Sequence, residues 1–181
     1  MNITILSAHS GNSGSSDFIN EFVGKSASAG HTVICHNIDN LDIHSCTGCW
    51  SCWVKTPGKC IFRDDMDTLL PDVIQSDLLV YFAEPILGYV NYRLKMVMDR
   101  SIPLVHPYIE LVQNECHHRK RYRKYPKFGV LVEDNQALEE EDLKNMEYLF
   151  LRFALNFKTD LSFFHTTEMP LQELIDEINH L

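Results

Sequence analysis

The chain has 181 residues and a formal net charge of −9, with 45% hydrophobic and 23% charged residues. This length suits one domain with a sizeable core, so we expect residues 1–181 to form a single domain. The composition is that of an ordinary globular protein, and no apolar run approaches the roughly 20 residues that span a bilayer. Because the acidic balance would repel a phosphate backbone, we do not expect nucleic acid as a partner. The lack of a spanning apolar run leads us to expect no membrane partner either.

The N-terminal residues carry no basic segment ahead of their apolar run and no cleavage pattern, so they do not resemble a signal peptide. We therefore expect the protein in the cytoplasm, where disulfides are rare. On that expectation the six cysteines are reduced thiols or ligands rather than disulfide partners.

Short runs rich in β-branched and aromatic residues predict strands at residues 2–8, 31–38, 78–84, 127–133 and 160–167. Segments with helical spacing predict helices at residues 17–30, 64–77, 90–102, 138–157 and 169–181. Alternation of strand and helix predicts an α/β fold, a parallel sheet with helices on both faces. In such sheets ligands bind beyond the carboxyl ends of the strands, which directs attention to the loops at 7–16, 39–64, 83–91 and 133–137.

The first of these loops is "SAHSGNSGSS", residues 7–16. Backbone N–H groups at the start of a helix favour an anion such as a phosphate. The loop is not a Walker A motif, because no Gly-Lys-Ser/Thr follows, and it is not a dinucleotide fingerprint, because Gly11 and Gly14 lack a third glycine and the required spacing. The same composition also suits a simple capping loop, since serine and asparagine favour helix starts.

The second informative loop is "CTGCWSCWVKTPGKC", residues 46–60. Its two-residue gaps between cysteines let a tight turn aim three sulfurs at a cluster, with a fourth farther along the chain. Zinc sites more often use two separated pairs, so the spacing favours an iron–sulfur cluster over zinc. Reduced, unligated thiols remain the alternative that spacing leaves open.

Two further features allow more than one interpretation. Six of the sixteen Lys and Arg residues lie in residues 119–127, which predicts a solvated connection or, alternatively, an anion site for a nucleotide. Cys35 falls in the second predicted strand and is interpreted as a small core residue.

The 7–16 loop resembles the phosphate loop of the flavodoxin-like NADPH-dependent FMN reductases, with Asn12, Gly14 and Ser15 in matching places. Ala8, His9 and Ser10 depart from the Ser-Pro-Arg usual there. The segment "EPILGYVNYRLKMVMDR", residues 84–100, is similar to the family's flavin-bordering segment, although Leu87 replaces an aromatic residue. Its matching positions are Pro85, Gly88, Leu94, Lys95, Asp99 and Arg100.

In spacing and position the cysteines resemble those of the iron–sulfur flavoproteins, a branch of this family that binds a 4Fe-4S cluster. The resemblance implies a flavodoxin-like three-layer sandwich with a five-stranded parallel sheet, FMN and a 4Fe-4S cluster. The implied cluster ligands are Cys46, Cys49, Cys52 and Cys60. The implied FMN-binding residues are Ser7, His9, Ser10, Asn12, Gly14, Ser15 and Ser16 near the phosphate, Pro85, Ile86, Leu87, Gly88 and Tyr89 at the ring, and Glu133 and Asp134 opposite.

The leading functional hypothesis is an FMN-dependent oxidoreductase that takes electrons from NAD(P)H or a reduced carrier and passes them to a small molecule or a protein. In the related proteins cluster and flavin exchange electrons across subunits, which implies a homo-dimer or homo-tetramer. Two alternatives stay open: a flavodoxin-like electron carrier without its own substrate, and a protein that has lost FMN and holds zinc in its cysteine loop. No residue is singled out as catalytic.

Overall fold

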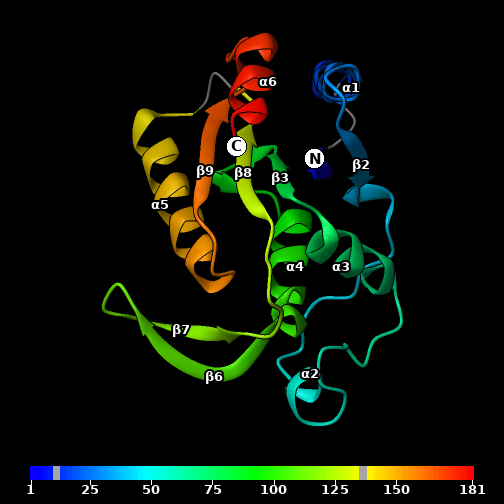
Figure 1. The fold of residues 1–181 in the computed structure, drawn as a ribbon, viewed down its shortest axis with the longest axis vertical. Coiled ribbons are helices and arrows are strands. Elements are labelled where there is room, and N and C mark those ends of the chain that lie inside the picture. The colour runs from blue at the N-terminus through cyan, green and yellow to red at the C-terminus, as the bar shows by residue number, and fades with distance from the viewer. Residues whose placement is uncertain (10–12, 135–137) are drawn as a thin grey trace.

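The computed structural model describes residues 1–9, 13–134 and 138–181. Its centre is a five-stranded sheet in the order β2-β1-β3-β8-β9, and every neighbouring pair is parallel (Figure 1). The strands are β1 (Asn2–Ala8), β2 (Thr32–Asn37), β3 (Leu78–Ala83), β8 (Lys127–Val132) and β9 (Leu161–Thr166). The five predicted strands are confirmed.

Helices cover both faces of the sheet. They are α1 (Ser13–Ser28), α3 (Met66–Gln75), α4 (Tyr92–Arg100), α5 (Glu140–Asn156) and α6 (Leu171–Asn179). One buried cluster joins the sheet to Phe22 of α1 and Ile175 of α6, and the other joins it to α3, α4 and α5. The three-layer sandwich is therefore confirmed. In the described residues no helix is both long and apolar enough to cross a membrane.

Several elements were not predicted. The largest is the antiparallel hairpin of β6 (Val105–Val112) and β7 (Glu115–Lys120), which turns through Gln113 and Asn114 with positive φ angles of 51° and 65°. The others are α2 (Ser51–Val54), the hairpin of β4 (Pro85–Ile86) and β5 (Tyr89–Val90), and the 3-10 turns η1 (Ile38–Asn40) and η2 (Ile102–Leu104). The mixed polar sequence of β7 shows no strand periodicity, because much of the hairpin is exposed.

The basic segment 119–127 links β7 to β8. Lys124 forms an ion pair with Asp77 at 2.5 Å, and Arg121 donates to the Val105 carbonyl at 3.3 Å. These two cations thus have separate partners within the chain, and the anion site stays a prediction. The interpretation of Cys35 as a core residue is wrong: its side chain is exposed, because β2 is an edge strand of the sheet.

Gly129 of β8 marks the tightest approach in the sheet. A Cβ atom at this position would lie 2.2 Å from Cζ of Phe163, the residue that pairs with Gly129 on β9. We expect Gly129→Ala to lower the free energy of unfolding by about 1–3 kcal/mol, because the overlap displaces a packed aromatic ring. Urea unfolding measures the loss.

The matched control is Gly24→Ala, since a Cβ at this α1 position meets nothing within 4 Å. Alanine has the higher helix propensity, so this control should be neutral or stabilising by up to about 1 kcal/mol. Equal unfolding free energies for the two variants would contradict the packing argument.

Candidate functional site

Three loops meet at the carboxyl edge of the sheet. In the strand register Ala8 pairs with Ala83, and Ala83 pairs with Val132, so the segments that follow β1, β3 and β8 leave the sheet side by side. Asn91, which caps α4, donates a side-chain hydrogen bond to the Ala8 carbonyl at 2.9 Å and holds two of these segments together. The expected location of a ligand site is thus assembled from segments distant in sequence.

His9 organises the first loop. Its Nδ1 lies 2.9 Å from Oγ of Ser7 and its Nε2 lies 2.9 Å from Oγ of Ser16, so both ring nitrogens are engaged. The ring is only 6% exposed and contacts Phe82 edge-on. His9 therefore ties the end of β1 to the first turn of α1. Of the predicted phosphate residues, Ser10 and Asn12 lie outside the described residues.

The start of α1 already receives an anion from within the chain. Buried Ser15 donates a hydrogen bond to the carboxylate of Glu133, which follows β8. The positive end of the helix dipole favours negative charge at this place. A Cβ added at Gly14 would meet nothing within 4 Å, so there is open space beside the helix start. These residues fit a phosphate group, and Glu133 would compete with it.

The β4–β5 hairpin presents the residues expected at the flavin ring. Pro85 is buried, whereas Ile86 is 50% and Leu87 fully exposed. Leu87 and Gly88 form the turn with φ angles of 51° and 73°. A left-handed conformation is uncommon for leucine and points its side chain outward, where a planar group could lie against it.

Two candidate residues remain: Tyr89, in β5 of this hairpin, and Asp134, which follows β8. Tyr89 is half-buried, and this burial raises the pKa of its hydroxyl. Asp134 is exposed, and its backbone N–H donates to Oγ1 of Thr167 at 2.8 Å.

All four cysteines of the 46–60 loop line one cavity of about 740 Å³. Burial raises the pKa of the Cys52 thiol, and the charges of Cys60, Cys46 and Cys49 raise it further, so the four groups lie within electrostatic reach of one another. Hydrogen bonds from Ser51 lower the pKa of Cys49. Gly48 and Gly58 adopt positive φ angles of 64° and 84°, which supports the predicted turns.

The donor set of this cavity wall fits an iron–sulfur cluster, which thiolates hold. In the described residues no three His, Cys, Asp or Glu side chains converge on one point that could hold a single metal ion. The ligands of a cluster bind different irons and therefore stand farther apart than those of one ion. Cys116 and His118 of β7 line the same cavity, and Trp53 packs on His118 with ring centroids 5.0 Å apart.

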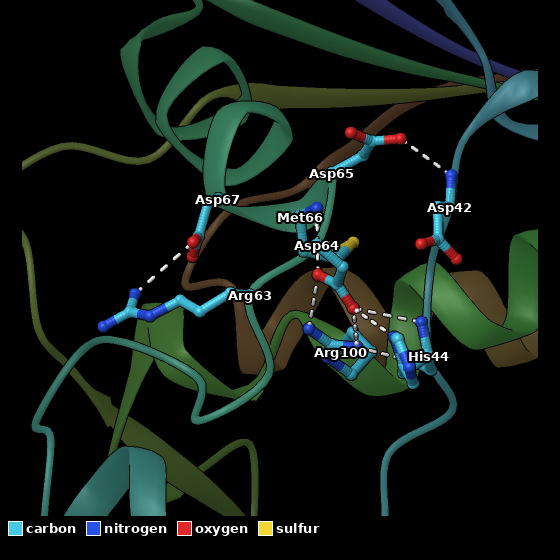
Figure 2. Close-up of polar contacts among 8 residues, drawn as sticks. All are labelled: Asp42, His44, Arg63, Asp64, Asp65, Met66, Asp67 and Arg100. Carbon is cyan, nitrogen blue, oxygen red and sulfur yellow. Dashed lines mark hydrogen bonds and ion pairs between the residues drawn. The ribbon is translucent and has the colours of Figure 1, made fainter.

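A buried ion pair closes the base of the cysteine loop (Figure 2). Arg100 of α4 donates to both carboxylate oxygens of Asp64, at 2.7 and 2.9 Å, and to the His44 carbonyl at 2.5 Å. The His44 backbone N–H donates to Asp64 at 3.0 Å. We call His44, Asp64 and Arg100 the loop clamp, because they join the residues just before Cys46 and just after Cys60.

The loop clamp was missed at the sequence level. Arg100 entered only as a match in the flavin-bordering segment, and Asp64 only as the start of a helix. Burial alone would raise the pKa of Asp64, but hydrogen bonds from Arg100 and the His44 backbone outweigh it and hold that pKa below its usual range. The partners of Asp64, His44 and Arg100, lie 20 and 36 residues away in sequence, so no local pattern reveals them.

Two iron–sulfur flavoproteins are similar to this chain in sequence. That of Methanocaldococcus jannaschii is 35% identical over 68 residues, which are 38% of this chain and 34% of that protein. That of Archaeoglobus fulgidus is 36% identical over 70 residues, 39% of this chain and 31% of that protein. The matches thus span about a third of the length of these relatives. No family model matches the chain.

Solved structures resemble the whole chain. An NAD(P)H:quinone oxidoreductase from Methanothermobacter marburgensis has a TM-score of 0.67 at 19% identity, over 99% of this chain and 90% of that one. A flavone reductase has a TM-score of 0.63 at 15% identity, over 99% of this chain and 58% of that one. At these identities the likeness concerns the fold. The chain therefore has the flavodoxin-like fold, and the proteins that it resembles in sequence are iron–sulfur flavoproteins.

Proposed function

We propose that this protein is an FMN-dependent oxidoreductase that holds a 4Fe-4S cluster in its cysteine loop and moves electrons from NAD(P)H or a reduced carrier to an acceptor. The main support for this proposal is the position of Tyr89. This residue belongs to the hairpin expected at the flavin ring, yet it lines the same cavity as Cys46, Cys49, Cys52 and Cys60. Two redox groups bound at these places would be neighbours.

Each part of the site has a role in this proposal. The hydroxyls of Ser15 and Ser16 and the start of α1 would hold the FMN phosphate, while Pro85 to Tyr89 would border the ring. The cysteine thiolates would hold the cluster. Bound FMN supplies both two-electron and one-electron chemistry, and the chain supplies binding and tuning.

Anaerobic purification followed by absorption spectroscopy, metal analysis and addition of NADPH tests the proposal. Flavin absorption bands, about four irons per chain and loss of the flavin absorption on addition of NADPH support it. Flavin and iron without bleaching by NADPH or NADH would instead favour the electron carrier. A colourless protein with zinc would overturn the flavin assignment and favour the third hypothesis.

Glu133 provides a test of the phosphate site. We expect Glu133→Gln to tighten FMN binding by about tenfold, because it removes one charge repulsion at close range. Titration of the apoprotein with FMN, followed by flavin fluorescence, measures the affinity.

Glu168→Gln is the control, since it makes the same charge change at an exposed residue that is not among the candidate FMN-binding residues. It should change the affinity little, because solvent screens an exposed charge. Weaker FMN binding by Glu133→Gln would mean that this carboxylate holds the ligand rather than competing with it.

We further propose a cytoplasmic homo-dimer or homo-tetramer. Large apolar side chains are exposed on α2, α4, α5 and the β6–β7 hairpin: Val54 is 75%, Tyr92 70%, Tyr148 56% and Leu111 74% exposed. A second copy of the chain would cover such surface. Light scattering after size-exclusion chromatography gives the oligomeric state, and a monomeric mass would contradict this proposal.

A further inference from the structure

Arg100 has one donor that the loop clamp does not use. Its two terminal nitrogens bind Asp64 and the His44 carbonyl, but its Nε is buried and has no hydrogen-bond partner among the described residues. A buried donor without a partner destabilises a fold, so this unpaired N–H is not explained by stability alone.

The charge of Arg100 also lies near the cysteine loop. Burial alone would lower the pKa of Arg100, but the hydrogen bond to Asp64 and the charges of Cys60, Asp64 and Cys46 raise it. The two cysteines that act on the guanidinium are the first and the last of the loop. Its side chain is 1% exposed, so solvent screens this interaction little.

An aromatic residue shields this region. The Phe62 ring lies 5.5 Å from Cζ of Arg100 and stacks on the His44 ring, with centroids 5.0 Å apart and planes at 5°. Phe62 lines the same cavity as the cysteines. A positive charge shielded in this way acts more strongly on a neighbouring anion than one exposed to water.

We propose that Arg100 positions the Cys46 and Cys60 ends of the loop and that its buried charge raises the reduction potential of the cluster. The inference rests on the proposed function, since it needs a cluster in the loop. Reduction adds one electron and one negative charge to the cluster, which a nearby cation stabilises. Arg100 is thus a positioning residue that also sets the electron affinity of the site.

The test compares three variants in the whole protein purified without oxygen. Arg100→Gln removes the charge. Arg100→Lys keeps the charge but loses the planar guanidinium that donates to both carboxylate oxygens of Asp64. Arg93→Gln is the matched control, because Arg93 also lies on α4 and donates to the Ile38 and Leu41 carbonyls, at 2.6 Å each. The readouts are iron per chain and the midpoint potential of the cluster from a redox titration followed by electron paramagnetic resonance.

We expect Arg100→Gln to shift the midpoint potential to more negative values, Arg100→Lys to shift it less, and Arg93→Gln to leave it unchanged. A wild-type potential in Arg100→Gln, or an equal shift in Arg93→Gln, would overturn the proposal. If Arg100→Gln does not fold or loses its cluster, the decision rests on Arg100→Lys. A midpoint potential of Arg100→Lys that is more negative than that of the wild type supports the role, and an unchanged potential overturns it.

A second readout separates this inference from the proposed function. In protein stripped of metal by a chelator, mass spectrometry follows alkylation of Cys46 and Cys60 by iodoacetamide, with exposed Cys35, outside the cavity, as the internal reference. Arg100→Lys should accelerate alkylation of the two loop cysteines relative to Cys35, and an unchanged ratio would overturn the positioning role. Wild-type protein that takes up no iron would refute the proposed cluster, whatever the alkylation rates are.

Discussion

Asp64→Ala lowers the free energy of unfolding by roughly 3–5 kcal/mol, because it leaves the buried charge of Arg100 without its partner. The side chains of Asp64 and Arg100 are 0% and 1% exposed, so water cannot replace the lost carboxylate. The carboxylate also accepts hydrogen bonds from the backbone of His44 and Met66, which lose their acceptor. Urea unfolding at neutral pH measures the change.

Asp67→Ala is the matched control, since Asp67 pairs with Arg63 at 3.3 Å in an exposed i,i+4 geometry. Exposed pairs contribute about 0–1 kcal/mol, so this variant should unfold almost like the wild type. A loss of similar size in both variants would show that the loop clamp stabilises the fold no more than a surface pair does.

The contribution of Asp64 to the free energy of unfolding also depends on pH. Because the pKa of Asp64 is lower in the folded than in the unfolded protein, its stabilisation is present above the unfolded carboxyl pKa of about 3.9 and is lost as the pH falls through the folded value. The stability difference between wild type and Asp64→Ala should therefore narrow in acid. A difference that grows below that pH would contradict the assigned sign.

For the proposed cluster, we expect Cys52→Ser to reduce the iron content from about four per chain to nearly none, while the proposed FMN stays bound. A serine hydroxyl is a poor iron–sulfur ligand, and Cys52 is the thiol on which the other three charges of the loop act. The residues at the carboxyl edge of the sheet are unchanged, so the flavin bands should persist. Metal analysis and absorption spectra of protein purified without oxygen give both quantities.

Cys35→Ser controls for the loss of a thiol as such, because Cys35 is exposed on the edge strand β2, outside the cavity that the cysteine loop lines. It should keep full iron and flavin. Iron retained in Cys52→Ser would refute the proposed ligand set. Loss of flavin together with iron would refute the independence of the two sites.

The order of strands and helices was predictable from sequence because it depends on local patterns. Leu78–Ala83 is buried at every position, as a central parallel strand requires, and its apolar run is visible without a structure. Residues of α4 such as Leu94 and Val97 show the helical spacing of a buried face. Alternation of such segments permits few architectures. The three-layer fold, and the sheet edge at which the ligand-binding loops lie, could therefore be predicted from it.

The position of the cysteine loop was also predictable, since its spacing is local and it follows the second strand. The exposure of Cys35 was not, because a strand's place in the sheet depends on which strands pair, and the sequence of β2 does not reveal that it lies at the edge.

Only the tertiary structure revealed the contacts that shape the site. Ser15 and Glu133 are 118 residues apart, and Asp64 and Arg100 are 36 apart. Hydrogen bonds and ion pairs between such residues leave no periodic trace, since each partner alone looks like an ordinary polar residue of a loop or helix end. Local patterns therefore determined the fold and the candidate ligands, whereas long-range pairing decided which charges surround them.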